Sequence, residues 1–173
     1  MRQRGFTLVE ILVVMVIIGV MIVGTMLAVG IGGGTDRQLE TERDRVVSLM
    51  DHLRDQAALQ VREYGLRVFE GGYQFLYYDP RQRLWLDEQD DLLRERELPP
   101  GLKMKLWIEG RPVVLPEAEV APGQRRPQVL LYSSGELNLF ELELRRDQGA
   151  GVRIKPADTT ESIDVQMLEP ERR

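Results

Sequence analysis

The sequence predicts an α+β protein in which one long N-terminal helix packs on an antiparallel β-sheet domain. The residues from Ile11 to Ile31 carry no charge, and apolar side chains then recur at helical spacing as far as residue 64. From residue 66 onward the period changes to alternation, interrupted by glycine and proline turns. About 140 residues follow the apolar segment, which is enough for one domain. Because the chain has no cysteine, packing alone must stabilise that domain.

The uncharged segment from Ile11 to Ile31 is long enough to cross a bilayer as a helix. At ~1.5 Å per residue its roughly 21 residues reach about 31 Å, close to the ~30 Å of a hydrocarbon core. Arg2 and Arg4 precede it, and the next basic residue is Arg37, which predicts a cytoplasmic N-terminus and an exported remainder. Small residues near its end leave one alternative open, removal of the segment as a secretory signal peptide. These residues are Ala28, Gly30 and Gly32.

The residues ahead of this segment, Gly5-Phe6-Thr7-Leu8-Val9-Glu10, resemble the prepilin processing site of type IV pilins and type II secretion pseudopilins. The resemblance implies that a prepilin peptidase cuts between Gly5 and Phe6, that Phe6 is N-methylated, and that the apolar helix stays attached. A residue without Cβ suits the cleavage site, because the peptidase must reach an extended backbone. The resemblance also implies a pilin-like fold and a single-pass protein of the inner membrane, with its C-terminal domain in the periplasm.

Glu10 is the carboxylate that interrupts the apolar sequence. An unpaired carboxylate at bilayer depth costs on the order of a few kcal/mol, so such residues usually have a partner. The resemblance implies that the partner is the Phe6 amine of a neighbouring subunit, and that this ion pair sets the register of assembly. The alternative is that Glu10 reaches the lipid headgroups from the end of the helix. Loss of residues 1–5 would change the formal charge from -5 to -7, since Arg2 and Arg4 are removed.

A second helical stretch follows the glycine-rich run at residues 30–34. Each glycine weakens a helix by about 1 kcal/mol, and Thr35 with Gln38 has the spacing of a capping box, so we expect the helix to restart there. Its apolar stripe predicts burial against the protein's own sheet, with a short coiled coil as the alternative. The stripe consists of Leu39, Val46, Met50, Leu53, Ala57, Val61 and Tyr64. Charged residues, Glu42 among them, are assigned to the other faces.

The remaining sequence predicts a sheet of short strands and one long exposed loop over residues 110–127. The apolar phase shifts at Leu139-Phe140, which predicts a β-bulge. The expected strands are Leu66–Phe69, Tyr73–Tyr78, Arg83–Leu86, Leu102–Ile108, Gln128–Tyr132, Leu137–Leu144, Val152–Ile154 and Ser162–Leu168. The predicted organisation is a leader at 1–5, a transmembrane helix at 6–31, the periplasmic half of the helix at 32–65 and a β-rich periplasmic domain at 66–173.

The segment from Pro127 to Glu136 extends the resemblance to the H-type minor pseudopilins, with Tyr132 and Ser134-Gly135 where that pattern usually has Phe and Asp-Gly. This resemblance implies a subunit that links the tip complex to the major pseudopilin shaft of a periplasmic pseudopilus and supports export of folded exoproteins. The implied partners are other minor pseudopilins, the major pseudopilin, the prepilin peptidase and the inner membrane. The alternative is a minor pilin of a type IV pilus, acting in adhesion or DNA uptake.

Other functions find little support in the sequence. We expect no catalytic residue, metal or cofactor and no small-molecule substrate, because His52 is the single histidine and Ser133 and Ser134 lie in a turn. A membrane-anchored periplasmic enzyme is therefore the weakest alternative. The acidic run from Asp87 to Glu97 contains no glycine, which favours a solvated loop over a calcium site.

Two further features of the sheet region bear on partners. Glu141 and Glu143 are expected on one solvated strand face, and Trp107 either covers a core edge or marks a contact surface. Beyond Gly34 the chain has 21 basic and 27 acidic residues, since Arg2, Arg4 and Glu10 are the charged residues before it. The net charge of -6 makes nucleic acid a poor partner, although Arg145-Arg146 or Arg172-Arg173 would form small basic patches.

Overall fold

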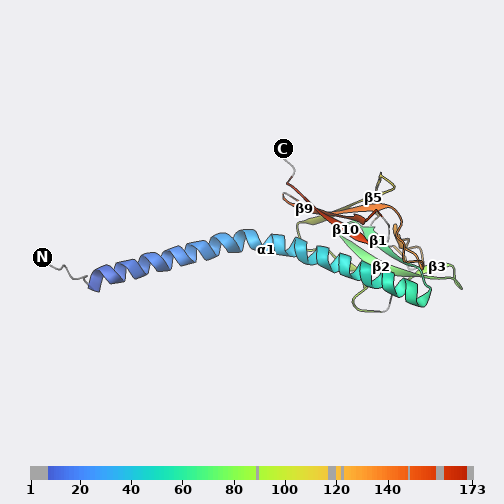
Figure 1. The fold of residues 1–173 in the computed structure, drawn as a ribbon, viewed down its shortest axis with the longest axis horizontal. Coiled ribbons are helices and arrows are strands. Elements are labelled where there is room, and N and C mark those ends of the chain that lie inside the picture. The colour runs from blue at the N-terminus through green and yellow to red at the C-terminus, as the bar shows by residue number, and fades with distance from the viewer. Residues whose placement is uncertain are drawn as a thin grey trace. The chain divides into compact units, whose positions relative to one another are not determined.

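The computed structural model describes residues 8–170 except 89, 117–119, 122, 148 and 159–161, and for residues 10 and 22–36 it describes the backbone alone. The chain divides into two compact units, Met1–Arg37 and Gln38–Arg173. Helix α1 (Leu8–Gln60) contributes residues to both, and all the strands belong to the second unit (Figure 1). The observed fold is therefore α+β, as predicted.

The first unit consists of the N-terminal part of α1. Its described apolar side chains are exposed, from 44% at Val14 to 86% at Leu8. Among the residues whose side chains are described, no helix has both the length and the apolar content that a membrane span requires. The backbone stays helical through residues 30–34, so the predicted restart is wrong, and Thr35 and Gln38 lie inside α1. Extending an existing helix needs no new nucleus, which offsets the cost of the glycines.

The apolar stripe on the C-terminal part of α1 is buried, as predicted. Five stripe residues are at most 2% exposed, and they share one core with the inner faces of both sheets: Leu39, Val46, Met50, Leu53 and Ala57. The helix ends at Gln60 because Val61 has a left-handed backbone, with φ 50°. The Arg62 amide then donates to the Ala57 carbonyl at 3.1 Å, the closing bond of a Schellman motif. Val61 is 81% exposed, so its assignment to the buried stripe was wrong.

Sheet A is antiparallel and has the strand order β3-β2-β1-β7, with β4 paired to β2. The predicted hairpin is confirmed, since the register pairs Phe69 with Gly72 across a two-residue turn in which Gly71 has φ 82°. The next turn is held by Asp79, whose carboxylate accepts the Arg81 amide at 2.8 Å, and these backbone hydrogen bonds lower the pKa of Asp79. The strands are β1 (Tyr64–Phe69), β2 (Gly72–Asp79), β3 (Leu84–Asp87), β4 (Arg96–Glu97) and β7 (Val129–Leu131). Tyr64 therefore opens a strand instead of ending the helix.

Sheet B is also antiparallel and has the order β10-β9-β8-β5-β6. Its strands are β5 (Leu102–Ile108), β6 (Arg111–Val113), β8 (Phe140–Arg146), β9 (Gly151–Pro156) and β10 (Ile163–Leu168). Strand β6 lies inside the predicted loop, so that prediction was wrong there. Glu109 and Gly110 both have positive φ, 50° and 76°, and this two-residue turn returns the chain onto β5.

The described residues of the segment after β6 are exposed or half-buried, as predicted for a loop, and part of the segment is fixed to sheet A. The Glu70 amide donates to the Pro116 carbonyl at 2.9 Å. Arg125 donates to the Asp87 carboxylate at 2.8 and 2.9 Å and to the Gln74 side chain at 3.4 Å. These contacts come from residues far apart in sequence, which is why composition alone did not reveal them.

The predicted bulge at Leu139-Phe140 is instead a crossing from one sheet to the other. Leu137 forms a bridge with Leu131 in sheet A, whereas Phe140 begins β8 of sheet B. Between them, the Asn138 side chain accepts the Leu130 amide at 2.8 Å and donates to the Gln128 carbonyl at 3.1 Å. The apolar phase shifts because Leu137 and Phe140 face the core from two different sheets.

Candidate functional site

The N-terminal motif and the start of α1 form the first candidate site. Gly5, Phe6 and Thr7 lie outside the described residues, and α1 begins at Leu8. Glu10 is therefore in the first turn of the helix by its backbone, while its side chain lies outside the description. In the sequence, no basic residue occurs between Arg4 and Arg37. This arrangement places a carboxylate at the beginning of an uncharged helical segment.

A second carboxylate of α1, Glu42, is buried where the helix enters the folded domain. It is 1% exposed. Arg96 of β4 donates from Nε to both Glu42 oxygens at 3.0 and 3.1 Å and also from Nη2. The Tyr73 hydroxyl of β2 donates to Glu42 Oε2 at 3.2 Å. We call these three residues the helix clasp, because they fasten α1 to two strands of sheet A.

The electrostatics of the helix clasp keep Arg96 charged and Tyr73 protonated. The hydrogen bond from Arg96 to Glu42 raises the pKa of Arg96. Burial, reinforced by the negative charge of Glu42, raises the pKa of Tyr73, so its hydroxyl remains a donor. A buried carboxylate is tolerated only when it is paired and hydrogen-bonded, and here both conditions are met. The chemistry of the clasp is structural, since the Glu42 oxygens are occupied by donors of the same chain.

Sequence reasoning missed the helix clasp and wrongly placed Glu42 on a solvated face. A signal was present, because Glu42 lies three residues after Leu39 and four before Val46, on the same helical face as both. Leu39 and Val46 are seven residues apart, and Glu42 occupies the position of the stripe between them. Sequence alone gave no means of finding Arg96, which comes from a strand of two residues.

The outward-facing side of sheet B corrects a second prediction. Glu143 is 5% exposed, although its strand position points away from the core. Its carboxylate accepts a hydrogen bond from Arg145 Nε at 2.7 Å, and the other carboxylate oxygen lies 3.6 Å from Arg153 Nη2. Arg153 stands directly opposite Glu143 in the register of β8 and β9. The long arginine side chains cover the carboxylate, so the expected solvated pair of Glu141 and Glu143 is wrong for Glu143.

Residues considered for catalysis or metal binding are dispersed in the structure. His52 is exposed on α1, as expected, and the Ser134 hydroxyl donates to Glu136 at 3.3 Å. In the acidic run, Asp87 pairs with Arg125 and Asp91 pairs with Arg94. Among the described residues, no group of three or more His, Cys, Asp or Glu side chains is placed to hold a metal ion.

Comparison with known proteins defines the class of this chain. Residues 1–32 match the family model described as the prokaryotic N-terminal methylation motif. The fold matches the crystal structure of the minor pseudopilin EpsH from the type II secretion system of Vibrio cholerae, with a TM-score of 0.61 and 19% identity over 81% of this chain and 99% of that one. The motif and the fold together define a pilin-like protein with an N-terminal methylation motif.

Two relatives narrow the class to one family. The chain is 42% identical to type II secretion system protein H of Pseudomonas aeruginosa over 143 residues, which is 82% of this chain and 83% of the relative. It is 30% identical to type II secretion system protein H of Aeromonas hydrophila over 149 residues, 83% of this chain and 81% of the relative. The chain belongs to the type II secretion system protein H family. The predicted family and pilin-like fold are confirmed.

Proposed function

We propose that this chain is a minor pseudopilin that links the tip complex to the major pseudopilin shaft, and that it enters the pseudopilus through the first turn of α1. The observation that carries the proposal is the methylation motif at residues 1–32, joined by one helix to the folded domain. In this proposal the apolar segment holds the chain in the inner membrane, with the N-terminus in the cytoplasm and residues from 32 onward in the periplasm. The uncharged sequence from Ile11 to Ile31 and the positions of Arg2 and Arg4 support that topology.

The assembly step that we propose pairs two groups from different subunits. Cleavage after Gly5 exposes the Phe6 amine, whose ordinary pKa near ~7.7 leaves it largely cationic, and methylation keeps the charge. Glu10 then lies four residues, or roughly 6 Å, further along the helix. The free energy of a carboxylate in apolar surroundings falls when a cation reaches it. Insertion in register with a neighbouring subunit supplies that cation.

The folded domain acts in this proposal as a scaffold that presents its sheets to other pseudopilins. The relatives carry the name of a secretion system protein, which favours a secretion pseudopilus over the type IV pilus alternative. Our proposal assigns the chain no chemical reaction and no small-molecule substrate. Its partners are the prepilin peptidase during maturation, and the other minor pseudopilins and the major pseudopilin during assembly.

Mass analysis of the protein from secreting cells tests this proposal directly. We expect a chain that begins at Phe6, heavier by about 14 Da for one methyl group and lighter by about 0.6 kDa for the lost leader, residues 1–5. A substitution of Gly5 by leucine should leave the uncut chain, whereas Gln3→Ala serves as the control inside the leader. A chain severed near residue 30 and free in the periplasm would contradict both the anchor and the ion pair.

A further inference from the structure

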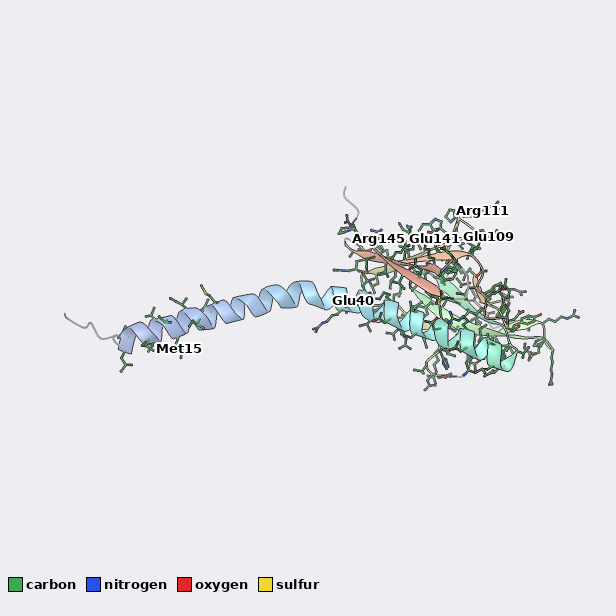
Figure 2. The ribbon with its side chains drawn as sticks, viewed as in Figure 1. Met15, Glu40, Glu109, Arg111, Glu141 and Arg145 are labelled. Carbon is green, nitrogen blue, oxygen red and sulfur yellow. The ribbon has the colours of Figure 1, made fainter. Side chains whose placement is uncertain are left out.

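The side of sheet B that faces away from the core forms a continuous surface, which we call the outer face. Core residues alternate with outward residues along β5, β8 and β9, and the registers place the outward residues of these strands and of the edge strand β10 side by side. The outward residues are Lys103, Lys105, Trp107, Glu141, Glu143, Arg145, Arg153, Lys155, Asp164 and Gln166. Figure 2 shows Glu141 and Arg145 together on this side, while Glu40 lies on α1.

The outer face is positively charged on a chain that is negative as a whole. Five of its residues are basic and three are acidic, whereas the whole chain has a formal charge of -5. The opposite balance occurs at residues 87–97, where six acidic residues accompany Arg94 and Arg96. Carboxylates and cations are thus segregated between two parts of the folded domain. Such segregation steers the approach of a partner and selects its orientation.

The arginines of the outer face are held in place before any partner binds. Buried Glu143 holds Arg145 at 2.7 Å and Arg153 at 3.6 Å, and Glu141 adds a 3.5 Å ion pair to Arg153. The side chain of Arg145 is 17% exposed and that of Arg153 is 35% exposed. Ordering these side chains therefore costs little on association. Trp107, half-buried and opposite Glu141 in the register, adds a residue type enriched at protein interfaces.

We infer that the outer face of sheet B docks a carboxylate-rich surface of a neighbouring pseudopilin subunit. The inference rests on the proposed function, since it names the contact by which the assembled subunit is held. Lys105 supplies an exposed ammonium group and Lys155 one that lies 3.9 Å from Asp164, and Arg145 and Arg153 supply fixed guanidinium groups. Three carboxylates among the cations favour a protein partner over an anionic lipid surface, because a lipid surface attracts net charge whereas a protein matches both signs.

The absence of cysteine allows a direct test in the full chain. Gln166→Cys places one thiol on the outer face, and Asp55→Cys places one at an exposed position of α1. Each is labelled with a thiol-linked benzophenone in cells that contain the whole secretion machine, and illuminated. We expect adducts with another pseudopilin from residue 166 at least ~10-fold more often than from residue 55.

Charge reversal then tests the electrostatic part of the inference. Lys105→Glu with Lys155→Glu, made in the Gln166→Cys chain, should reduce the adduct about tenfold or more. The matched control is Arg81→Glu with Arg83→Glu, which makes the same change in net charge at exposed positions of the turn between β2 and β3. This control should leave the adduct unchanged. Tryptophan fluorescence during unfolding verifies that both variants are folded.

Three results would overturn the inference. Equal adducts from residues 166 and 55 would show that the outer face is not a preferred contact. Equal loss in both charge-reversed pairs would show that only net charge matters. Adducts with phospholipid alone would identify a membrane contact. If the unaltered chain does not co-purify with any pseudopilin, the proposed function fails; if it does, and the Lys105/Lys155 variant crosslinks normally, only the docking inference fails.

Discussion

Two glutamates of the same helix differ in where a counter-charge can come from: Glu10 lies at the start of the uncharged N-terminal segment, and Glu42 lies on the buried face of a charged stretch. Glu42 finds Arg96 and Tyr73 within its own folded domain. Glu10 lies in a stretch of sequence without a basic residue between Arg4 and Arg37. We infer from this difference that Glu42 serves the stability of the domain and Glu10 serves assembly.

The free energies involved explain why a carboxylate suits either task. Removing one member of a buried ion pair costs about 3–5 kcal/mol, because the other member stays buried without its partner. A carboxylate in the apolar part of a membrane costs on the order of a few kcal/mol until a cation reaches it. For Glu42, the counter-charge that offsets this cost comes from its own chain, during folding. For Glu10, the counter-charge comes only when a second chain arrives.

The largest expected effect is that of Glu42→Ala on folding. It leaves Arg96 and Tyr73 without their acceptor, and we expect a loss of about 3 kcal/mol in the free energy of unfolding, at the lower end because Arg96 is 38% exposed. Denaturant unfolding of the full chain in detergent, followed by the fluorescence of Trp85 and Trp107, measures the loss. Glu40→Ala is the matched control, since Glu40 is exposed on the same helix and should cost less than about 0.5 kcal/mol. Equal losses in the two variants would contradict the role of the helix clasp.

Glu10→Ala should have the opposite effect to Glu42→Ala, because it should impair assembly and leave the stability of the chain unchanged. We expect normal cleavage, normal membrane insertion and an unfolding free energy within about 0.5 kcal/mol of the unaltered chain. Incorporation into sheared pseudopili, with secretion measured in the same cells, should fall at least ~10-fold, equivalent to about 1.4 kcal/mol of lost assembly energy. Normal recovery in filaments would remove the ion pair from the mechanism.

The smallest effect, Val61→Gly, separates stability from assembly. Val61 adopts φ 50°, which is unfavourable for a branched residue and natural for glycine at the end of a helix. We expect the glycine variant to gain about 1 kcal/mol in unfolding free energy. Combined with Glu42→Ala it should restore part of the lost stability, and combined with Glu10→Ala it should restore no secretion. Rescue of the Glu10 variant would show that its defect arises from folding.

Several patterns read from neighbouring residues in the sequence agreed with the structure. The stripe from Leu39 to Ala57 predicted a buried helix face, and alternation over Leu102–Ile108 predicted β5. The glycine at position 71 predicted the first hairpin, because its turn requires positive φ. These features depend on contacts a few residues apart, or on one face meeting a generic core.

Several incorrect predictions have a different cause, namely a partner that is distant in sequence. Glu143 looked solvated until β9 placed Arg153 beside it. The phase shift near Leu139 looked like a bulge until Leu137 and Phe140 proved to belong to different sheets. The pairing of Arg125 in the proline-rich segment with Asp87 was likewise not visible in the composition of that segment.

The sequence by itself determined the processing motif, the uncharged segment that follows it, and the change from a long helix to strands, because each is encoded in contiguous residues. Only the tertiary structure decided which charges are buried and which side chains pair with them, since Glu42, Tyr73 and Arg96 come from three separate elements. The same holds for the outer face of sheet B, whose charges are brought together by strand register. Burial raises the cost of an unpaired charge, so the fold selects the partners that the linear sequence cannot show.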